Sequence, residues 1–553
     1  MRLPNRSILV AALAFGLVAV APRARAQHEH GGSGTAPSGV PMFRNFASFH
    51  HPVATTSAEA QTMFDQGLGL YYAFNDDEAI RSFKEAARLD PDMAMAWWGV
   101  AMALGPNINV PMSADAEKQA LDALAKAQAA KGASASDRDY IYTLTLRYAV
   151  PAGEHRAARD SAYAAAMRVL MKKYPKDDDA AILCAESLML LRPWDFYDAA
   201  GKAKPGVNAF VSILEGVLER SPRSIGAIHF YIHAVEASPH PERAEVYADE
   251  LRKLAPEAGH LLHMPSHIYL RVGRYDDAIA VNERAVAADH KYLDAWKPET
   301  MYAMMYHPHN IHMRWSALCE VGRAADAADA ARQLDDAVPW DMVRQAPPLE
   351  AFRAVDYYTP VRFGKWEEIL AMPAPPDGMR IAAGFWHYAR GMALAATGKF
   401  DGASAEQDSV TAIAAGLPSD AMFAVNAARP VMEYAGQMLQ GEIAARSGKT
   451  DDAIALLTKA VATHDALLYD EPPPWCATAR QALGAVLLQA GRAKEAADVY
   501  REDLRRTPNN GWSLFGLAQA EKAMKDAAAA AKAEAAFRKV WHASDVTLTA
   551  SRF

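Results

Sequence analysis

Pairs of small residues recur along this chain at one spacing, and they constrain its fold more than any other feature. A glycine is followed twelve positions later by an alanine at Gly67 with Ala79, Gly391 with Ala403, Gly441 with Ala453 and Gly484 with Ala496. Small residues let two helices cross closely, so this spacing predicts pairs of antiparallel helices. Because each pair buries its apolar face only against its neighbours, we expect an all-α solenoid.

The segments between the two predicted helices of a pair have a common pattern. At 273–278 and 491–496 a glycine is followed within a few residues by an acidic residue and then an alanine. Glycine is typical of the end of a first helix, and an acidic residue is typical of the start of a second. The segment 61–91 carries further markers of a helix-turn-helix repeat of about 34 residues. These markers are Gly67, Ala79, Phe83, Ala86 and Pro91.

In these residues the chain resembles the tetratricopeptide repeat (TPR) family, over roughly residues 58 to 545. The pattern is degenerate at 106–222 and 339–380. The resemblance implies a right-handed superhelix of antiparallel helix pairs. It also implies a concave groove that holds a peptide, a protein or a small ligand.

The start of the sequence indicates export. Arg2 and Arg6 precede an apolar run, and Ala24-Arg25-Ala26 supplies a cleavage pattern, so we expect residues 1–26 to be a signal peptide of a bacterial-type exported protein. The periplasm and the extracellular space both remain open as destinations. After it we expect a Gly/Ser/Pro/His leader and entry segment at 27–57, N-terminal repeats at 58–222, central histidine-rich repeats at 223–338, and C-terminal repeats with a capping helix at 339–553.

Charge and cysteine content exclude several classes of protein. A net charge of -8 with mixed signs gives no electrostatic reason to bind nucleic acid or an anionic membrane. The three cysteines, Cys184, Cys319 and Cys476, are far apart, which argues against a disulfide framework. After the signal peptide no uninterrupted apolar segment of about 18 residues occurs, so we expect no membrane span.

Histidines occupy matching places in three predicted helical segments in the middle of the chain, which open near Ile225, Gly259 and Pro308. In the TPR register these places face the groove. The groove-facing set comprises His229, His233 and Glu236, then His260, His263 and His267, and lastly His309, His312 and Cys319. Residues four apart on a helix project from one face, which groups His229 with His233 and His263 with His267 independently of the resemblance.

Two such pairs on adjacent helices predict a transition-metal site, because imidazoles from both helices can converge on one ion or on two. The predicted ligands are His229, His233, His263, His267, His309 and His312. Imidazoles suit zinc, copper, iron or nickel better than magnesium or calcium. The alternative is a polar groove without metal, whose imidazoles bond to one another or to a bound peptide.

Glu236 lies one helical turn from His233 and has two candidate roles. It could act as a catalytic general base beside a metal-bound water, or it could orient a histidine ring. We therefore expect an exported TPR-type binding protein with a histidine-built metal centre. A metal-dependent hydrolase or oxidoreductase with the same centre is the alternative, and the sequence does not decide whether the chain is an enzyme.

One segment outside the repeats is unusual. Three consecutive prolines between Glu471 and Trp475 predict a rigid extended loop that presents both residues. We expect Trp475 near the groove. The loop is either a lid over that groove or a stiff connector between helices.

Overall fold

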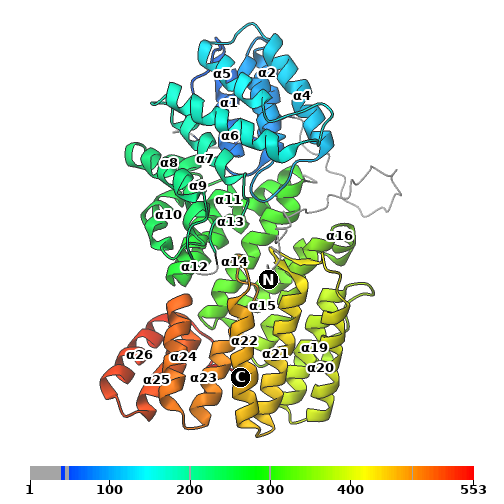
Figure 1. Ribbon diagram of the computed structural model, residues 1–553, viewed down its shortest axis with the longest axis vertical. Coiled ribbons are helices and arrows are strands. Elements are labelled where there is room, and N and C mark those ends of the chain that lie inside the picture. The colour runs from blue at the N-terminus through cyan, green and yellow to red at the C-terminus, as the bar shows by residue number, and fades with distance from the viewer. Residues whose placement is uncertain (1–38, 44–45, 47–48, 199–200, 298–299, 476) are drawn as a thin grey trace, which may run out of the picture. The chain divides into compact units, whose positions relative to one another are not determined.

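The computed structural model describes residues 39–553 apart from 44–45, 47–48, 199–200, 298–299 and 476 (Figure 1). Throughout this part of the chain the elements are helices, and the strands are a short antiparallel pair, β1 (Met422–Phe423) and β2 (Asn426–Ala427). The expected all-α fold is confirmed. The expected signal peptide and the leader up to residue 38 lie outside the described residues.

The chain divides into two compact units. Among the described residues, the first comprises those within 39–198 together with 203–234, and the second comprises 201–202 together with those within 235–553. The segment 223–338, expected as one set of central repeats, is thus shared between the two units. No described helix combines the length and apolar character that a bilayer crossing requires.

The first unit consists of short helices that pack against their neighbours in sequence. They are α1 (Ala58–Tyr71), α2 (Asp76–Leu89), α3 (Ala94–Ala103), α4 (Ala114–Ala129), α5 (Ala135–Thr145), α6 (Arg156–Lys173), α7 (Asp178–Met189), α8 (Val207–Arg220) and α9 (Ile225–Val235), whose last residue belongs to the second unit.

The second unit continues in the same manner. Its first part comprises η1 (Pro241–Ala244), α10 (Glu245–Leu251), α11 (Gly259–His263), α12 (Pro265–Val272), α13 (Tyr275–Trp296), η2 (Tyr302–Tyr306), α14 (His307–Glu320), α15 (Ala324–Ala337), α16 (Trp340–Gln345), η3 (Pro347–Ala354), α17 (Val355–Arg362) and α18 (Trp366–Ala371). Here η1 and η3 are 3-10 helices and η2 is a π-helix. The helices that follow are α19 (Arg380–Ala396), α20 (Phe400–Gly416), α21 (Ala428–Arg446), α22 (Thr450–Asp465), α23 (Ala479–Gln489), α24 (Ala493–Arg506), α25 (Gly511–Ala523) and α26 (Ala527–Val540).

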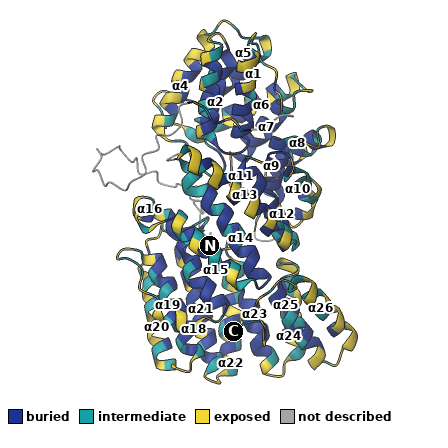
Figure 2. Ribbon diagram, turned by 180° about the vertical axis from the view of Figure 1, so that it is seen from behind, coloured by how far each residue is buried: buried dark blue, intermediate teal, exposed yellow. Residues whose placement is uncertain are grey.

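The small residues lie where helices cross, as the sequence predicts. A Cβ added at Gly67 of α1 would lie 2.7 Å from the ring of Phe83 on α2, and one added at Gly484 of α23 would lie 2.5 Å from Tyr500 on α24. The turn glycines Gly273 and Gly491 both have a φ of +74°, the left-handed conformation that ends a helix. Figure 2 shows buried residues along the facing sides of the helices. The described elements therefore form a TPR-like fold of helix pairs.

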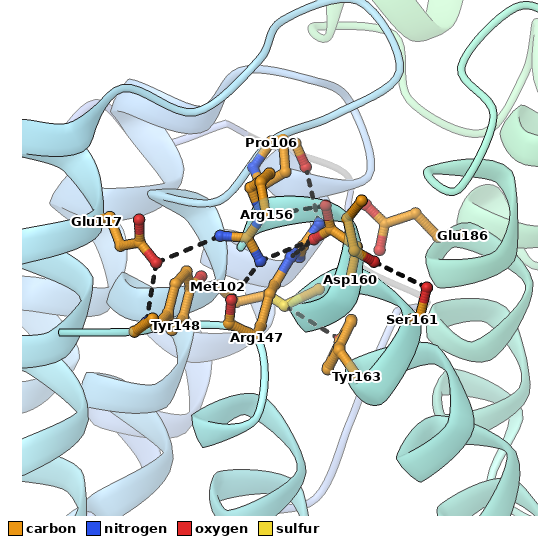
Figure 3. Close-up of polar contacts among 12 residues, drawn as sticks. Met102, Pro106, Glu117, Arg147, Tyr148, Arg156, Asp160, Ser161, Tyr163 and Glu186 are labelled. Atoms are coloured by element: carbon orange, nitrogen blue, oxygen red, sulfur yellow. Dashed lines mark hydrogen bonds and ion pairs between the residues drawn. The ribbon is translucent and has the colours of Figure 1, made fainter. Parts of the chain in front are cut away.

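The core of the first unit contains a buried polar network (Figure 3). The guanidinium of Arg147 is fully buried, lies 4.9 Å from the ring centroid of Tyr163 and donates to the carbonyl of Pro106 at 3.3 Å. Glu186 of α7 is also buried and accepts a hydrogen bond from the hydroxyl of Tyr71. Its second carboxylate oxygen has no hydrogen-bond partner among the described residues. A buried carboxylate with one bond is costly to ionise.

Glu186 should therefore give the first unit a pH-dependent stability. Burial raises the pKa of Glu186 from 4.5 to about 7, against the opposing effects of Arg147 and of the bond from Tyr71. Between these two pKa values the folded unit binds more protons than the unfolded chain. The contribution of Glu186 to the free energy of unfolding is therefore fully present below about pH 4.5 and is lost as the pH rises through 7. We expect Glu186→Gln, which keeps an acceptor for Tyr71, to stabilise the unit at pH 8 by about 3 kcal/mol.

Urea titrations at pH 5 and pH 8 measure this effect, with hydrogen–deuterium exchange in α1 and α7 as the readout of unfolding in the first unit. The exposed Glu59, also on α1, provides a control variant, Glu59→Gln, that should keep the wild-type pH dependence. An equal pH dependence in Glu186→Gln and in wild type would contradict the assignment.

Candidate metal centre

Three of the six predicted metal ligands come together in the second unit. His263 ends α11, His267 lies in α12 and His309 lies in the first turn of α14. One nitrogen from each ring lies within 4.8 Å of the other two. The exposed fractions of His263 and His267 are 0% and 2%, whereas His309 is half-buried. The group is therefore a largely desolvated cluster of three imidazoles.

The chain around His263 and His267 stays helical across a proline. Pro265 opens α12, where its missing N–H is not needed, and Met264 keeps a helical conformation between α11 and α12. The amide of Met264 donates to the carbonyl of His260 at 3.0 Å. His263 and His267 consequently lie one turn apart on the same face, as their spacing predicts.

The tautomer of His263 is set by Asn282 of α13. The Nδ2 of Asn282 donates to the carbonyl of Ala278 at 2.8 Å, which turns its Oδ1 toward His263. The Nδ1 of His263 lies 2.7 Å from that oxygen. Since an amide oxygen only accepts, Nδ1 carries the proton and the Nε2 of His263 keeps its lone pair.

Carboxylates set the tautomer of His267 in the same way. Its Nδ1 lies 2.7 Å from Oε2 of Glu236 and also contacts Oε2 of Glu471. Nδ1 is therefore the donor, and the Nε2 of His267 carries a lone pair. The two Nε2 atoms of His263 and His267 are 2.7 Å apart. Two lone pairs at this distance repel unless a proton or a metal cation lies between them.

Two buried carboxylates meet at the Nδ1 side of His267. Burial raises the pKa of Glu471 well above its ordinary value, and the neighbouring Glu236 raises it further. The hydroxyl of Tyr469 donates to Oε1 of Glu471. Burial and the neighbouring Glu236 favour the neutral acid form of Glu471, so the pair carries less than two negative charges.

Glu471 reaches the cluster from the proline-rich loop between α22 and α23. At the other end of this loop Trp475 is only 3% exposed. Its ring centroid lies 4.6 Å from that of Tyr358, 4.8 Å from Tyr434 and 5.1 Å from Tyr388. The structure thus places Trp475 in an aromatic core, where it anchors the loop as a stiff connector.

The remaining predicted residues of the second unit are not members of the three-imidazole group, although His260 lies against it. The ring of His312 lies 5.5 Å from that of Trp315 and 5.6 Å from that of Phe352, and burial lowers the pKa of His312 to about 3. Cys319 is buried, and its carbonyl accepts from the indole of Trp512 at 2.9 Å. His260 is buried with its ring 5.6 Å from that of His263.

His229 and His233 belong to the first unit. Their rings are 4.9 Å apart on α9, which confirms that they share a helix face. The Nδ1 of His229 lies 2.5 Å from the carbonyl of Tyr72, and His233 stacks on Phe74 at 5.9 Å. Within their unit both rings therefore lie against aromatic side chains.

A further histidine of the first unit has a structural role. The Nδ1 of His51 lies 2.7 Å from Asp179 of α7, whose other oxygen accepts from the hydroxyl of Tyr72 at 2.7 Å. Burial lowers the pKa of His51, but Asp179 outweighs it and the net pKa is raised. The nearby Asp177 caps α7 through the amide of Ala180. These bonds fix the entry segment to the helices.

Comparisons with known proteins add little to this site. No protein-family model and no curated protein matches the chain. Among solved structures it is similar to human IFIT1 in a dimer with m7Gppp-AAAA, at 13% identity and a TM-score of 0.34 over 89% of this chain and 92% of that one. Cut9 in complex with Hcn1 is 13% identical, with a TM-score of 0.30 over 89% of this chain and 75% of that one. Yeast Tom70 is 13% identical, with a TM-score of 0.25 over 85% of this chain and 90% of that one. TM-scores this low carry no inference about function.

Proposed function

We propose that this chain is an exported TPR-like binding protein that holds a transition-metal ion between His263, His267 and His309. The observation that carries the proposal is the 2.7 Å separation of two Nε2 atoms whose lone pairs face each other. A tetrahedral ion bound at 2.0 to 2.1 Å needs its ligand nitrogens about 3.3 Å apart, so a small rotation of either ring admits it. The half-buried His309 supplies the third nitrogen.

The surroundings of the three rings match those of metal-bound histidines. Such histidines usually donate their second nitrogen to a carboxylate or a carbonyl, which orients the ring and strengthens the ligand. Glu236 does this for His267, and Asn282 does it for His263. Glu236 is therefore assigned the orienting role rather than that of a catalytic base. Imidazole ligands suit zinc, copper, iron or nickel.

The proposed partner is a peptide, a protein or a small ligand held in the groove of the helical repeats. Nucleic acid and membrane are not proposed partners, because the net charge is -8 and no described helix could cross a bilayer. Periplasmic or extracellular location is part of the same proposal and rests on the amino-terminal sequence.

Elemental analysis of protein purified without a histidine tag tests the metal centre. We expect about one ion of zinc, copper, iron or nickel per chain, because three imidazoles and a water complete a tetrahedral site. His263→Gln and His267→Gln should lose the ion. His312→Gln is the matched control and should retain it, since His312 lies among aromatic rings.

The opposing result is a folded wild-type protein that contains no metal and takes none up from added zinc or copper. A shared proton would then hold His263 and His267 together, and the search would turn to peptide partners. Circular dichroism of each variant separates loss of the ion from loss of the fold.

Asn282 tests whether ring orientation contributes to binding. Asn282→Leu leaves the Nδ1 proton of His263 without its acceptor, and metal affinity should fall about 10- to 100-fold. Asn282→Asp keeps an acceptor oxygen and should remain within a few-fold of wild type. Competition with a chromophoric chelator measures both affinities, and an unchanged Asn282→Leu affinity would contradict the role given to Asn282.

A metal-dependent enzyme is the second candidate, favoured by the number of imidazoles. Three protein ligands leave one position for water or substrate, as in catalytic zinc sites. In cobalt-substituted protein, azide should then displace the water and change the visible absorption spectrum. A spectrum unaffected by azide would indicate a closed site and favour a structural or carrier role for the ion.

A further inference from the structure

A second histidine with an orienting carboxylate lies elsewhere in the second unit. Asp289 of α13 is buried, and its Oδ2 lies 3.3 Å from the Nδ1 of His307, the first residue of α14. The same oxygen accepts from Nδ2 of Asn310 at 2.7 Å, and Oδ1 accepts from the hydroxyl of Tyr302 at 2.8 Å. Three donors thus fix this carboxylate, and its position directs the Nδ1 proton of His307.

An exposed histidine lies beside this pair. His290 follows Asp289 on α13, and its ring centroid is 5.0 Å from that of His307. Because Nδ1 of His307 donates to Asp289, its Nε2 keeps a lone pair, as in the orienting arrangement at His267. Partial burial and the neighbouring His307 lower the pKa of His290. Two adjacent imidazoles are therefore available here.

Direct contacts connect these residues to the metal centre. The hydroxyl of Tyr302, bonded to Asp289, accepts from the amide of His260 at 2.9 Å. The ring of His260 stacks on that of His263 with centroids 5.6 Å apart and planes at 27°. Gly259 permits the approach of Asp289, because an added Cβ there would lie 1.9 Å from its Oδ1. The outer and inner histidines thus belong to one packed group.

We propose that His290 and His307 form an outer transition-metal site that captures an ion at the surface and passes it inward to the centre. This inference rests on the proposed metal-binding function. The inner ligands His263 and His267 are buried, so a hydrated ion must lose water before it reaches them. The exposed imidazole of His290 and the buried imidazole of His307 behind it replace part of the hydration shell, and a two-ligand site is weak enough to release the ion.

The outer site is tested by stopped-flow mixing of the metal-free full chain with limiting zinc. A fluorescent zinc indicator reports the rate at which free zinc is taken up. When zinc is limiting, the loading rate follows the occupancy of the outer site. His290→Ala should slow loading about tenfold or more, because loss of a ligand costs at least what loss of an orienting partner does. The final zinc content of the centre should not change. His307→Gln should give the same result.

His240→Ala is the matched control, because His240 is also an exposed histidine of the second unit, and its ring forms an ion pair with the exposed carboxylate of Glu242 at 3.1 Å. It should load at the wild-type rate. His263→Gln should abolish the stable zinc of the centre and leave the fast, weak capture phase.

The outcomes separate this inference from the proposed function. Wild-type loading rates in His290→Ala would overturn the outer site, place the entry at the half-buried His309, and leave His307 and Asp289 as a structural bond between α13 and α14. A wild-type chain that binds no zinc at all would overturn the proposed function and this inference together. Equal slowing in His240→Ala would show a general effect of removing an exposed imidazole and would also overturn the outer site.

Discussion

Close crossing of helices at small residues is the constraint on which this structure depends. Gly67 and Gly484 each bring an aromatic ring of the following helix to within 3 Å of the position that a Cβ would occupy. The same device shapes the functional region, because Gly259 lets Asp289 of α13 lie against the start of α11. A larger residue at such a position must displace its neighbour, at a typical cost of about 1 to 3 kcal/mol. The packing that defines the fold therefore also sets the positions of the histidines.

The histidine cluster is built from local and distant parts of the second unit. His263 and His267 are one helical turn apart, while Asn282 comes from the next helix and Glu471 from a loop some two hundred residues further along the chain. Each imidazole that contacts an acceptor at Nδ1 is left with a lone pair at Nε2. Such an arrangement, repeated at His263, His267 and His307, converts a set of buried polar rings into oriented ligands.

The sequence predicts the fold class and part of the site. Glycine and alanine at a fixed spacing are sufficient to predict helix pairs, because helix crossing distance depends on local residue size. The spacing of four also predicts the shared faces of His229 with His233 and of His263 with His267. It does not predict Asn282, since an amide becomes an orienting group only through a tertiary contact. His312 shares the predicted register, but the local packing turns its ring toward Trp315.

Charge balance explains why the carboxylates matter as much as the imidazoles. A divalent cation enclosed by neutral rings would lose most of its hydration energy with no anion to replace it. Glu236 supplies a buried negative charge on the far side of His267, and burial together with the neighbouring Glu236 favours the neutral form of Glu471. The first unit provides a contrast, because there the fixed cation Arg147 is fully buried near Glu186 and opposes part of the effect of burial on the pKa of Glu186. In the second unit Arg271 of α12 attracts Glu236 electrostatically. A proton or a bound metal ion between the Nε2 atoms of His263 and His267 adds positive charge on the other side of the His267 ring.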